Sequence, residues 1–178
     1  MSARSAFPPL LLLALFAGAG TVQAQEASMA AGSSTASRPA PEWWVDVNLA
    51  SYHLGNTSDF LAPGQRFNQE NYGAGVEVQW QPRHAVSAGY YRNSVDRDSY
   101  YALYHYTPLR FGRYVRVGGM AGLVTGYPGY NDGGLAPAGG LVAKIEGRRA
   151  GVNLIYLPKI AGVTPHTLGL QFKLRLGN

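Results

Sequence analysis

TLGLQFKLRL, residues Thr167–Leu176, alternates between apolar and polar side chains along its length. Leucine or phenylalanine takes every second position, and Gly169, Gln171, Lys173 and Arg175 fall between them. A period of two is typical of a β-strand with one apolar face. A strand of a soluble sandwich could alternate in this way, but two charges on the presumed inner face favour a barrel with a polar lumen and a lipid-facing exterior.

Seven more segments upstream have a similar length and a period close to two. Most contain about ten residues, which a tilted strand needs to cross a bilayer. The sequence therefore predicts an all-β fold: an eight-stranded antiparallel transmembrane β-barrel of the bacterial outer membrane. The expected strands are Trp44–Leu54, Tyr72–Gln81, His84–Asn93, Ser99–Tyr106, Tyr114–Val124, Leu135–Glu146, Arg149–Leu157 and Pro165–Leu176.

Aromatic residues and connection lengths indicate how the barrel sits in the membrane. Bacterial barrels place short turns on the periplasmic side and longer loops outside. The joins QPRH and EGRR read as tight turns, and TPLRFGR as a somewhat longer join on the same side. This places His53, Asn93 and Ser94 at or near the outer rim. Aromatic residues near the segment ends fit interface girdles: Trp43, Trp44, Tyr52, Tyr72, Trp80, Tyr114, Tyr127 and Tyr156.

The N-terminus reads as a secretory signal peptide covering residues 1–24. Arg4 precedes the short apolar run Leu10–Gly20, and small residues precede a cleavage site after Ala24. Residues 25–42 are rich in Ala, Ser and Pro and predict a flexible lead-in. Residues 43–178 are the expected barrel domain.

The composition narrows the possible functions of the 178-residue chain. It has no cysteine, which excludes a disulfide scaffold and a thiolate metal site. Its four histidines lack metal-ligand spacing, so we expect no metal site. The net charge is +5, but the arginines sit mostly at predicted turns rather than in one stripe. We therefore expect contact with anionic lipid headgroups and no nucleic acid.

His53 ends the first expected strand, and Asn93 and Ser94 end the third. A histidine near a serine is a usual arrangement for acyl transfer, because the imidazole takes the hydroxyl proton. Asparagine and serine are also favoured turn residues, since their side chains bond local backbone. A plain hairpin turn is therefore the alternative interpretation of this cluster.

The order and spacing of these elements resemble the outer-membrane lipid A palmitoyltransferase family (PagP-like), an eight-stranded barrel enzyme. The matching features are Tyr52-His53 at the end of the first strand, FNQENYGAGVEVQW, and YYRNS at the end of the third strand. Pro137 and Pro158 stand where the family has prolines beside gaps in strand pairing. The resemblance covers nearly all of the expected barrel.

The resemblance implies a site made of His53, Asn93 and Ser94. His53 would be the base-like residue and Ser94 the catalytic hydroxyl, with Asn93 where the family has aspartate. Asparagine cannot carry the charge that stabilises an imidazolium. The gaps beside Pro137 and Pro158 would be lateral entrances for lipid.

The leading hypothesis is a monomeric acyltransferase that moves a fatty acyl chain from a membrane phospholipid to the lipid A of lipopolysaccharide. It would need no metal and no cofactor. The alternative is a non-catalytic eight-stranded outer-membrane barrel with a structural or adhesion role, which the asparagine favours. A lipid hydrolase on the same scaffold is a third reading, but no acidic calcium loop supports it.

Overall fold

The computed structural model describes residues 40–55, 57, 60–61, 64–160 and 164–177. The predicted signal peptide and most of the predicted lead-in lie outside these residues.

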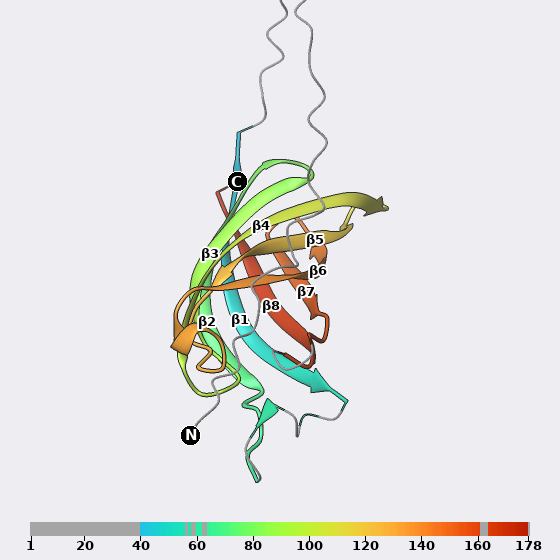
Figure 1. Cartoon of the computed structure of the whole chain (residues 1–178). Helices are drawn as coiled ribbons and strands as arrows, with labels where there is room; N and C mark the ends of the chain where they lie inside the picture. Colours follow the sequence, from blue (N-terminus) through green and yellow to red (C-terminus); the bar gives the residue numbers. More distant parts are fainter. Residues whose placement is uncertain (1–39, 56, 58–59, 62–63, 161–163, 178) are drawn as a thin grey trace, which may run out of the picture. The chain divides into compact units, whose positions relative to one another are not determined.

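The described chain forms a closed antiparallel barrel in which consecutive strands pair and β1 also pairs with β8 (Figure 1). The predicted fold class is confirmed: an eight-stranded antiparallel β-barrel of the transmembrane type. Apart from the strands, the structure has a short 3-10 turn, η2, at Asn131–Gly133. The strands are β1 (Glu42–Leu54), β2 (Glu70–Gln81), β3 (His84–Arg92), β4 (Asp98–Phe111), β5 (Val115–Val124), β6 (Ala136–Glu146), β7 (Ala150–Leu157) and β8 (His166–Leu176).

The alternation in β8 separates the two faces of the barrel wall. Leu170 is 40% exposed on the outside, whereas Lys173 is 0% exposed inside. Other strands have the same exposed apolar outer face, including Leu141 and Leu154. This surface is suited to a lipid environment. No helix within the described residues is long and apolar enough to cross a bilayer.

The connections divide the barrel into a long-loop end and a short-turn end. The predicted division is confirmed except for one join. Long connections follow β1, β5 and β7, a shorter turn follows β3 at the same end, and the tightest turns follow β2, β4 and β6 at the other end. The join TPLRFGR is shorter than expected, because β4 continues to Phe111 after a register shift between Tyr106 and Leu109. Pro108 lies in this irregular stretch, where a missing N–H is tolerated.

A group of buried ion pairs fills the lumen toward the short-turn end; we call it the ionic plug. Lys173 Nζ lies 2.6 Å from Glu77 Oε1 and 2.7 Å from Glu146 Oε1. Lys144 Nζ lies 2.8 Å from the same Glu77 oxygen, and Arg116 pairs with Glu146. Four strands thus contribute charges to one network inside the wall. A lumen of eight strands is narrow enough for side chains to fill it.

The lumen toward the long-loop end is lined by apolar and aromatic side chains. Its core is a cluster of Tyr101, Val124 and Ala136. A Cβ on Gly75 or on Gly89 would collide with the hydroxyl of Tyr101, so both positions need glycine. Four more residues pack against the cluster: Tyr91, Leu103, Tyr127 and Ala138.

Two residues expected in the interface girdles lie elsewhere. Trp44 is 1% exposed and points into the lumen, where Lys173 Nζ lies 4.5 Å from its ring centroid. Tyr127 packs against the apolar cluster at the long-loop end. In contrast, Trp43, Tyr52 and Tyr72 are exposed as expected. Strict alternation puts neighbouring tryptophans on opposite faces, so only one of the pair can face lipid.

The ionic plug predicts a large stability cost when Glu77 loses its charge. We expect Glu77→Gln to lower the free energy of unfolding by about 3–5 kcal/mol, because Lys144 then stays buried without its carboxylate partner. Glu70→Gln is the matched control at an exposed position, with an expected effect within about 0.5 kcal/mol. Urea unfolding of the barrel in lipid vesicles measures both. Equal effects of the two variants would contradict the role given to the plug.

Candidate functional site

A β-bulge in β1 determines where His53 points. The pairing of β1 with both neighbours shifts between Asn48 and Ala50, and against β8 this shift leaves Leu49 as an extra residue. Beyond the bulge, His53 lies opposite Thr167, a buried residue on the lumen face of β8. Without the extra residue the inside–outside alternation would turn His53 toward the lipid. The bulge therefore places the imidazole inside the barrel mouth.

The His53 ring stacks on an aromatic ring of the β1–β2 loop. Its centroid lies 4.0 Å from that of Phe67, with 15° between the ring planes. The Nδ1 atom is buried and has no hydrogen-bond partner. A buried ring nitrogen without a partner is unusual in a native fold, because such groups are nearly always satisfied. The imidazole thus keeps an unused donor or acceptor for another group.

The side-chain amide of Asn93 organises the β3–β4 turn. Its Oδ1 accepts the backbone N–H groups of Val95 at 3.0 Å and Arg97 at 2.9 Å. Its Nδ2 donates to Ser99 Oγ at 2.9 Å and to the Gly126 carbonyl at 2.8 Å. The residue is fully buried, and both ends of its amide are occupied. Asn93 therefore has the structural role expected of a turn asparagine.

Ser94 is buried, and its side chain lies near the phenol of Tyr127. The Tyr127 hydroxyl also lies 2.8 Å from the Tyr91 hydroxyl. Burial raises the pKa of Tyr127 above that of an ordinary phenol, so this loop residue stays neutral. A neutral phenol is a donor that can orient the Ser94 oxygen.

The three predicted site residues share the long-loop end but do not form a hydrogen-bonded triad. Within the described residues, no hydrogen bond joins His53 to Asn93 or Ser94. The dipeptide Phe67-Asn68 connects them: the ring of Phe67 stacks on His53, and the Asn68 N–H donates to the Ser94 carbonyl at 2.9 Å. Sequence reasoning missed Phe67 and Tyr127, because nothing local marks a loop aromatic as a neighbour of a distant strand end.

Pairing between β6 and β7 covers only the second half of β6, Leu141–Glu146. The last pair is Leu141 with Tyr156, so Ala136–Gly140 has no partner on its β7 side. The N–H of Gly147 donates to the Ala150 carbonyl at 2.8 Å, and every second N–H of β6 from there also faces β7. If the ladder continued toward the start of β6, residue 139 would pair with residue 158. The N–H of residue 137 would be the next one to donate to β7.

Both of those later positions of the ladder involve proline. Pro158 cannot donate to Gly139, and Pro137 has no N–H to direct toward β7. The two prolines therefore account for a lateral gap in the wall, on the long-loop side. The wall facing the lumen here consists of small or apolar residues that are buried or half-buried: Ala136, Ala138, Gly140, Ile155 and Leu157.

The described residues contain no group of three or more His, Asp or Glu side chains that could hold a metal ion. The long-loop end thus offers a hydroxyl, an imidazole and a neutral phenol as reactive groups. These groups can perform proton transfer and nucleophilic attack.

Several solved structures are similar to this chain, and two of them are described here by their fold. The solution NMR structure of the de novo designed TMB2.3 matches with a TM-score of 0.56 at 17% identity, over 79% of this chain and 99% of that one. The crystal structure of the N-terminal beta-barrel domain of Pseudomonas aeruginosa OprF gives a TM-score of 0.44 at 14% identity, over 76% and 97% of the two chains. No protein-family model and no curated protein matches.

The likeness to TMB2.3 concerns the fold: a closed eight-stranded barrel. It does not bear on an activity. The resemblance to lipid A palmitoyltransferases accordingly stays a prediction from the sequence.

The hydrogen bonds of Asn93 predict separable effects of two substitutions. Asn93→Asp keeps the oxygen that accepts the N–H groups of Val95 and Arg97 but removes the donor to the Gly126 carbonyl. We expect the carbonyl carbon chemical shift of Gly126 to change, because this carbonyl loses its donor, while amide hydrogen exchange at Val95 and Arg97 stays slow. Asn93→Ala should change the Gly126 shift and also accelerate exchange at Val95 and Arg97 by about tenfold, the loss of roughly one hydrogen bond each. The control Ser94→Ala should do neither, and equal acceleration at Val95 and Arg97 by both Asn93 variants would refute the proposed division of roles.

Proposed function

We propose that this protein is an acyltransferase of the bacterial outer membrane that moves a fatty acyl chain from a phospholipid to the lipid A part of lipopolysaccharide. The observation that carries the proposal is the lateral gap between β6 and β7. It lies at the same end of the barrel as His53 and Ser94, and apolar side chains line the wall inside it.

The gap supplies a route for an acyl chain from the membrane to the lumen. Outside it, Leu141 and Ile160 are exposed toward the lipid. Inside it, Ile155 and Leu157 are half-buried, and Ala138 of β6 packs against the apolar cluster. A hydrocarbon chain can therefore pass between two apolar environments without crossing a polar layer. The ionic plug closes the far part of the lumen, so the chain would end above it.

The proposed reaction has two steps. The Ser94 hydroxyl attacks the ester carbonyl of the phospholipid, while His53 takes the hydroxyl proton. His53 returns that proton to the leaving oxygen, and a lysophospholipid departs. A lipid A hydroxyl then attacks the acyl-serine, its proton passes through His53 to Ser94, and the serine is restored. No oxidant, metal or nucleotide is consumed.

His53 and Ser94 must come within hydrogen-bond distance for this chemistry. Phe67 covers one face of the imidazole, so the loop that carries Phe67 is the element we expect to move. The free Nδ1 of His53 supports the assignment of a proton acceptor here. Tyr127 would orient the serine oxygen for attack.

A second candidate function is a non-catalytic outer-membrane barrel with a structural or adhesion role. Asn93 favours it, because its amide is consumed by the turn and cannot stabilise an imidazolium as a carboxylate does. The ionic plug fits either function, because it closes the lumen to solutes in both cases.

Mass spectrometry of lipid A from envelopes of cells expressing this protein tests the proposal. We expect the parent protein to add the mass of one acyl chain. Ser94→Ala and His53→Ala should abolish the addition, because one removes the nucleophile and the other the proton acceptor. His84→Ala is the matched control: this histidine lies at the opposite end of the barrel and should leave acylation unchanged.

The amount of folded barrel in the outer membrane is measured for every variant. An unchanged lipid A profile in cells with folded parent protein would exclude lipid A acylation and favour the non-catalytic barrel. Acylation that persists in Ser94→Ala would refute the role assigned to the serine.

A further inference from the structure

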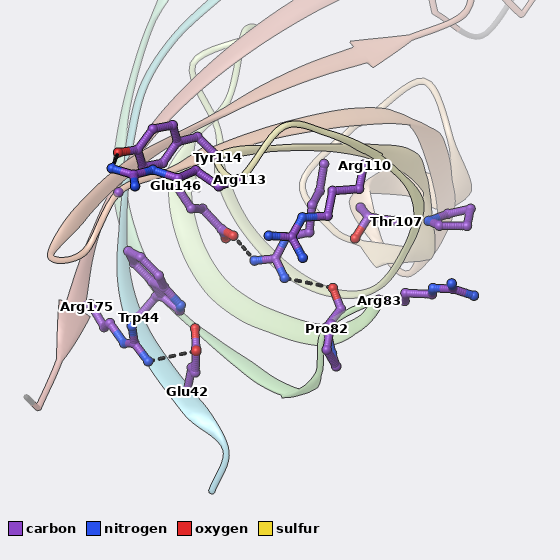
Figure 2. Close-up of a pocket in the computed structure, with 13 residues that line it drawn as sticks. Glu42, Trp44, Pro82, Arg83, Thr107, Arg110, Arg113, Tyr114, Glu146 and Arg175 are labelled. Atoms are coloured by element: carbon purple, nitrogen blue, oxygen red, sulfur yellow. Dashed lines mark hydrogen bonds and ion pairs between the residues drawn. The ribbon is translucent and has the colours of Figure 1, made fainter. Parts of the chain in front are cut away.

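Side chains tie the wall of the barrel together at its short-turn end. A pocket of about 460 Å³ opens there and is lined by five arginines and two glutamates (Figure 2). Arg175 pairs with Glu42 at 2.7 Å and so joins β8 to β1. Arg116 pairs with Glu146 of β6 and donates to the Pro82 carbonyl at 2.7 Å, which joins β5 to the β2–β3 turn. The long-loop end differs, because the pairing of β6 with β7 ends before it.

The prolines beside the β6–β7 gap weaken the ladder there but do not abolish it. Each proline lacks an N–H but keeps a carbonyl that can accept a hydrogen bond. Continued pairing would let the Gly139 N–H donate to the Pro158 carbonyl. One step further, the Ile160 N–H would donate to the Pro137 carbonyl. Backbone groups that face lipid without a partner are costly, so these two bonds would be favourable. Another restraint is therefore needed to hold the chain after Pro158 away from β6.

His166, at the start of β8, provides a contact of this kind. Its Nδ1 accepts the Lys159 N–H at 3.1 Å and lies 2.7 Å from the Tyr156 hydroxyl. A ring nitrogen that accepts an N–H carries no proton, so the phenol is the second donor to Nδ1. The two rings are stacked, with 5.8 Å between their centroids and 11° between their planes. The imidazole thus binds the backbone of the residue that directly follows Pro158.

This contact replaces a backbone bond at the end of the β7–β8 ladder. The last pair of that ladder is Leu157 with Thr167. In register with it, the next bond would run from the Lys159 N–H to the Pro165 carbonyl. That carbonyl instead accepts the hydroxyls of Thr164 at 3.2 Å and Thr167 at 3.1 Å. The imidazole therefore serves as the acceptor for a strand donor that faces β8.

Ile160 is bound within the β7–β8 connection. Its N–H donates to the Thr164 carbonyl at 2.9 Å, and its carbonyl accepts the Thr164 N–H at 3.0 Å. The donor that could close the ladder onto Pro137 is thus already used. The contact of Lys159 differs, because it depends on a side chain that can be substituted without changing the backbone.

We propose that His166 is a positioning residue of the lipid entrance. By holding Lys159 to β8, its imidazole keeps the chain after Pro158 off β6 and the gap open. The use of the gap by lipid rests on the proposed acyltransferase function, whereas the open gap is a property of the wall that is measured without lipid A. The proposed role needs no contact between His166 and a substrate.

Disulfide trapping in the purified full-length protein, reconstituted in lipid vesicles, measures closure of the gap. The chain has no cysteine, so two introduced thiols can react only with each other within one molecule. The substitutions are Ala138→Cys and Lys159→Cys, because continued pairing would place these residues directly opposite each other. Residue 159 keeps its backbone N–H. A pair of Cα atoms more than about 7 Å apart cannot be bridged without backbone movement. We therefore expect slow disulfide formation under a mild oxidant while His166 is present.

Substitutions of His166 in this background separate its acceptor from its ring. His166→Phe keeps a ring against Tyr156 but removes the acceptor. We expect disulfide formation to become about tenfold faster, the consequence of losing roughly one hydrogen bond. His166→Asn should restore the slow rate, since its amide oxygen can accept the N–H of residue 159. His84→Phe is the matched control, because its Nδ1 lies 2.5 Å from the Tyr104 hydroxyl at the short-turn end.

Heat-dependent gel mobility confirms that each variant is folded. Equal rates in His166→Phe and the parent would overturn the proposal. An equal rise in His84→Phe would also overturn it, because the barrel would then have loosened as a whole. Fast trapping in the parent would do the same, since the gap would close with the imidazole in place.

Lipid A acylation in cells tests the role in lipid entry separately. His166→Phe should lower acylation severalfold, and His166→Asn should restore it. Unchanged acylation in a variant whose gap closes would overturn the assignment to lipid entry. If the parent adds no acyl chain, the acyltransferase proposal fails, while the disulfide rates still decide whether His166 holds the gap open.

Discussion

Lys173 bonds to Glu77 and Glu146 at once, and this shared contact constrains the whole barrel. Charges removed from water cost several kcal/mol each unless partners and hydrogen bonds compensate them. The partners here come from β2, β6 and β8, so they meet only if every intervening strand pairs in register. A slip of one residue would turn the charges of a strand toward lipid. The network thus ties the register of distant strands to a single buried cluster.

The plug also divides the lumen into two chemical environments. Toward the long-loop end, tyrosines and aliphatic side chains surround the bulge-directed His53 and the turn of Asn93. Toward the short-turn end, arginines surround an open pocket. A solute would have to disrupt several buried ion pairs to pass between the two. The described lumen therefore offers no open channel between the two ends.

The strands could be predicted from the sequence because side chains that face lipid are apolar and recur at every second residue. Local irregularities that interrupt this period of two could not be predicted. The extra residue Leu49 reverses the facing of His53, and the irregularity at Pro108 lets β4 run on to Phe111. Both are invisible without the register of the neighbouring strands.

The candidate site was predicted in part. The sequence placed His53, Asn93 and Ser94 at one rim, and the fold agrees with that location. Their partners could not be predicted, because Phe67 and Tyr127 approach from loops whose path depends on tertiary packing. The occupied amide of Asn93 likewise follows from Gly126, which is 33 residues away. Trp44 was wrongly predicted to lie in the interface girdle. Trp43 and Trp44 are identical residues, and the sequence does not show which of the two faces outward.

The prolines beside the lateral gap have a second consequence. A strand edge left open in a membrane offers backbone donors to any extended chain that passes, and such edges recruit foreign strands. Pro137 and Pro158 remove two of the donors that would complete the β6–β7 ladder, and Gly139 has no side chain to anchor a newcomer. The wall can therefore stay open at this point without becoming a template for aggregation.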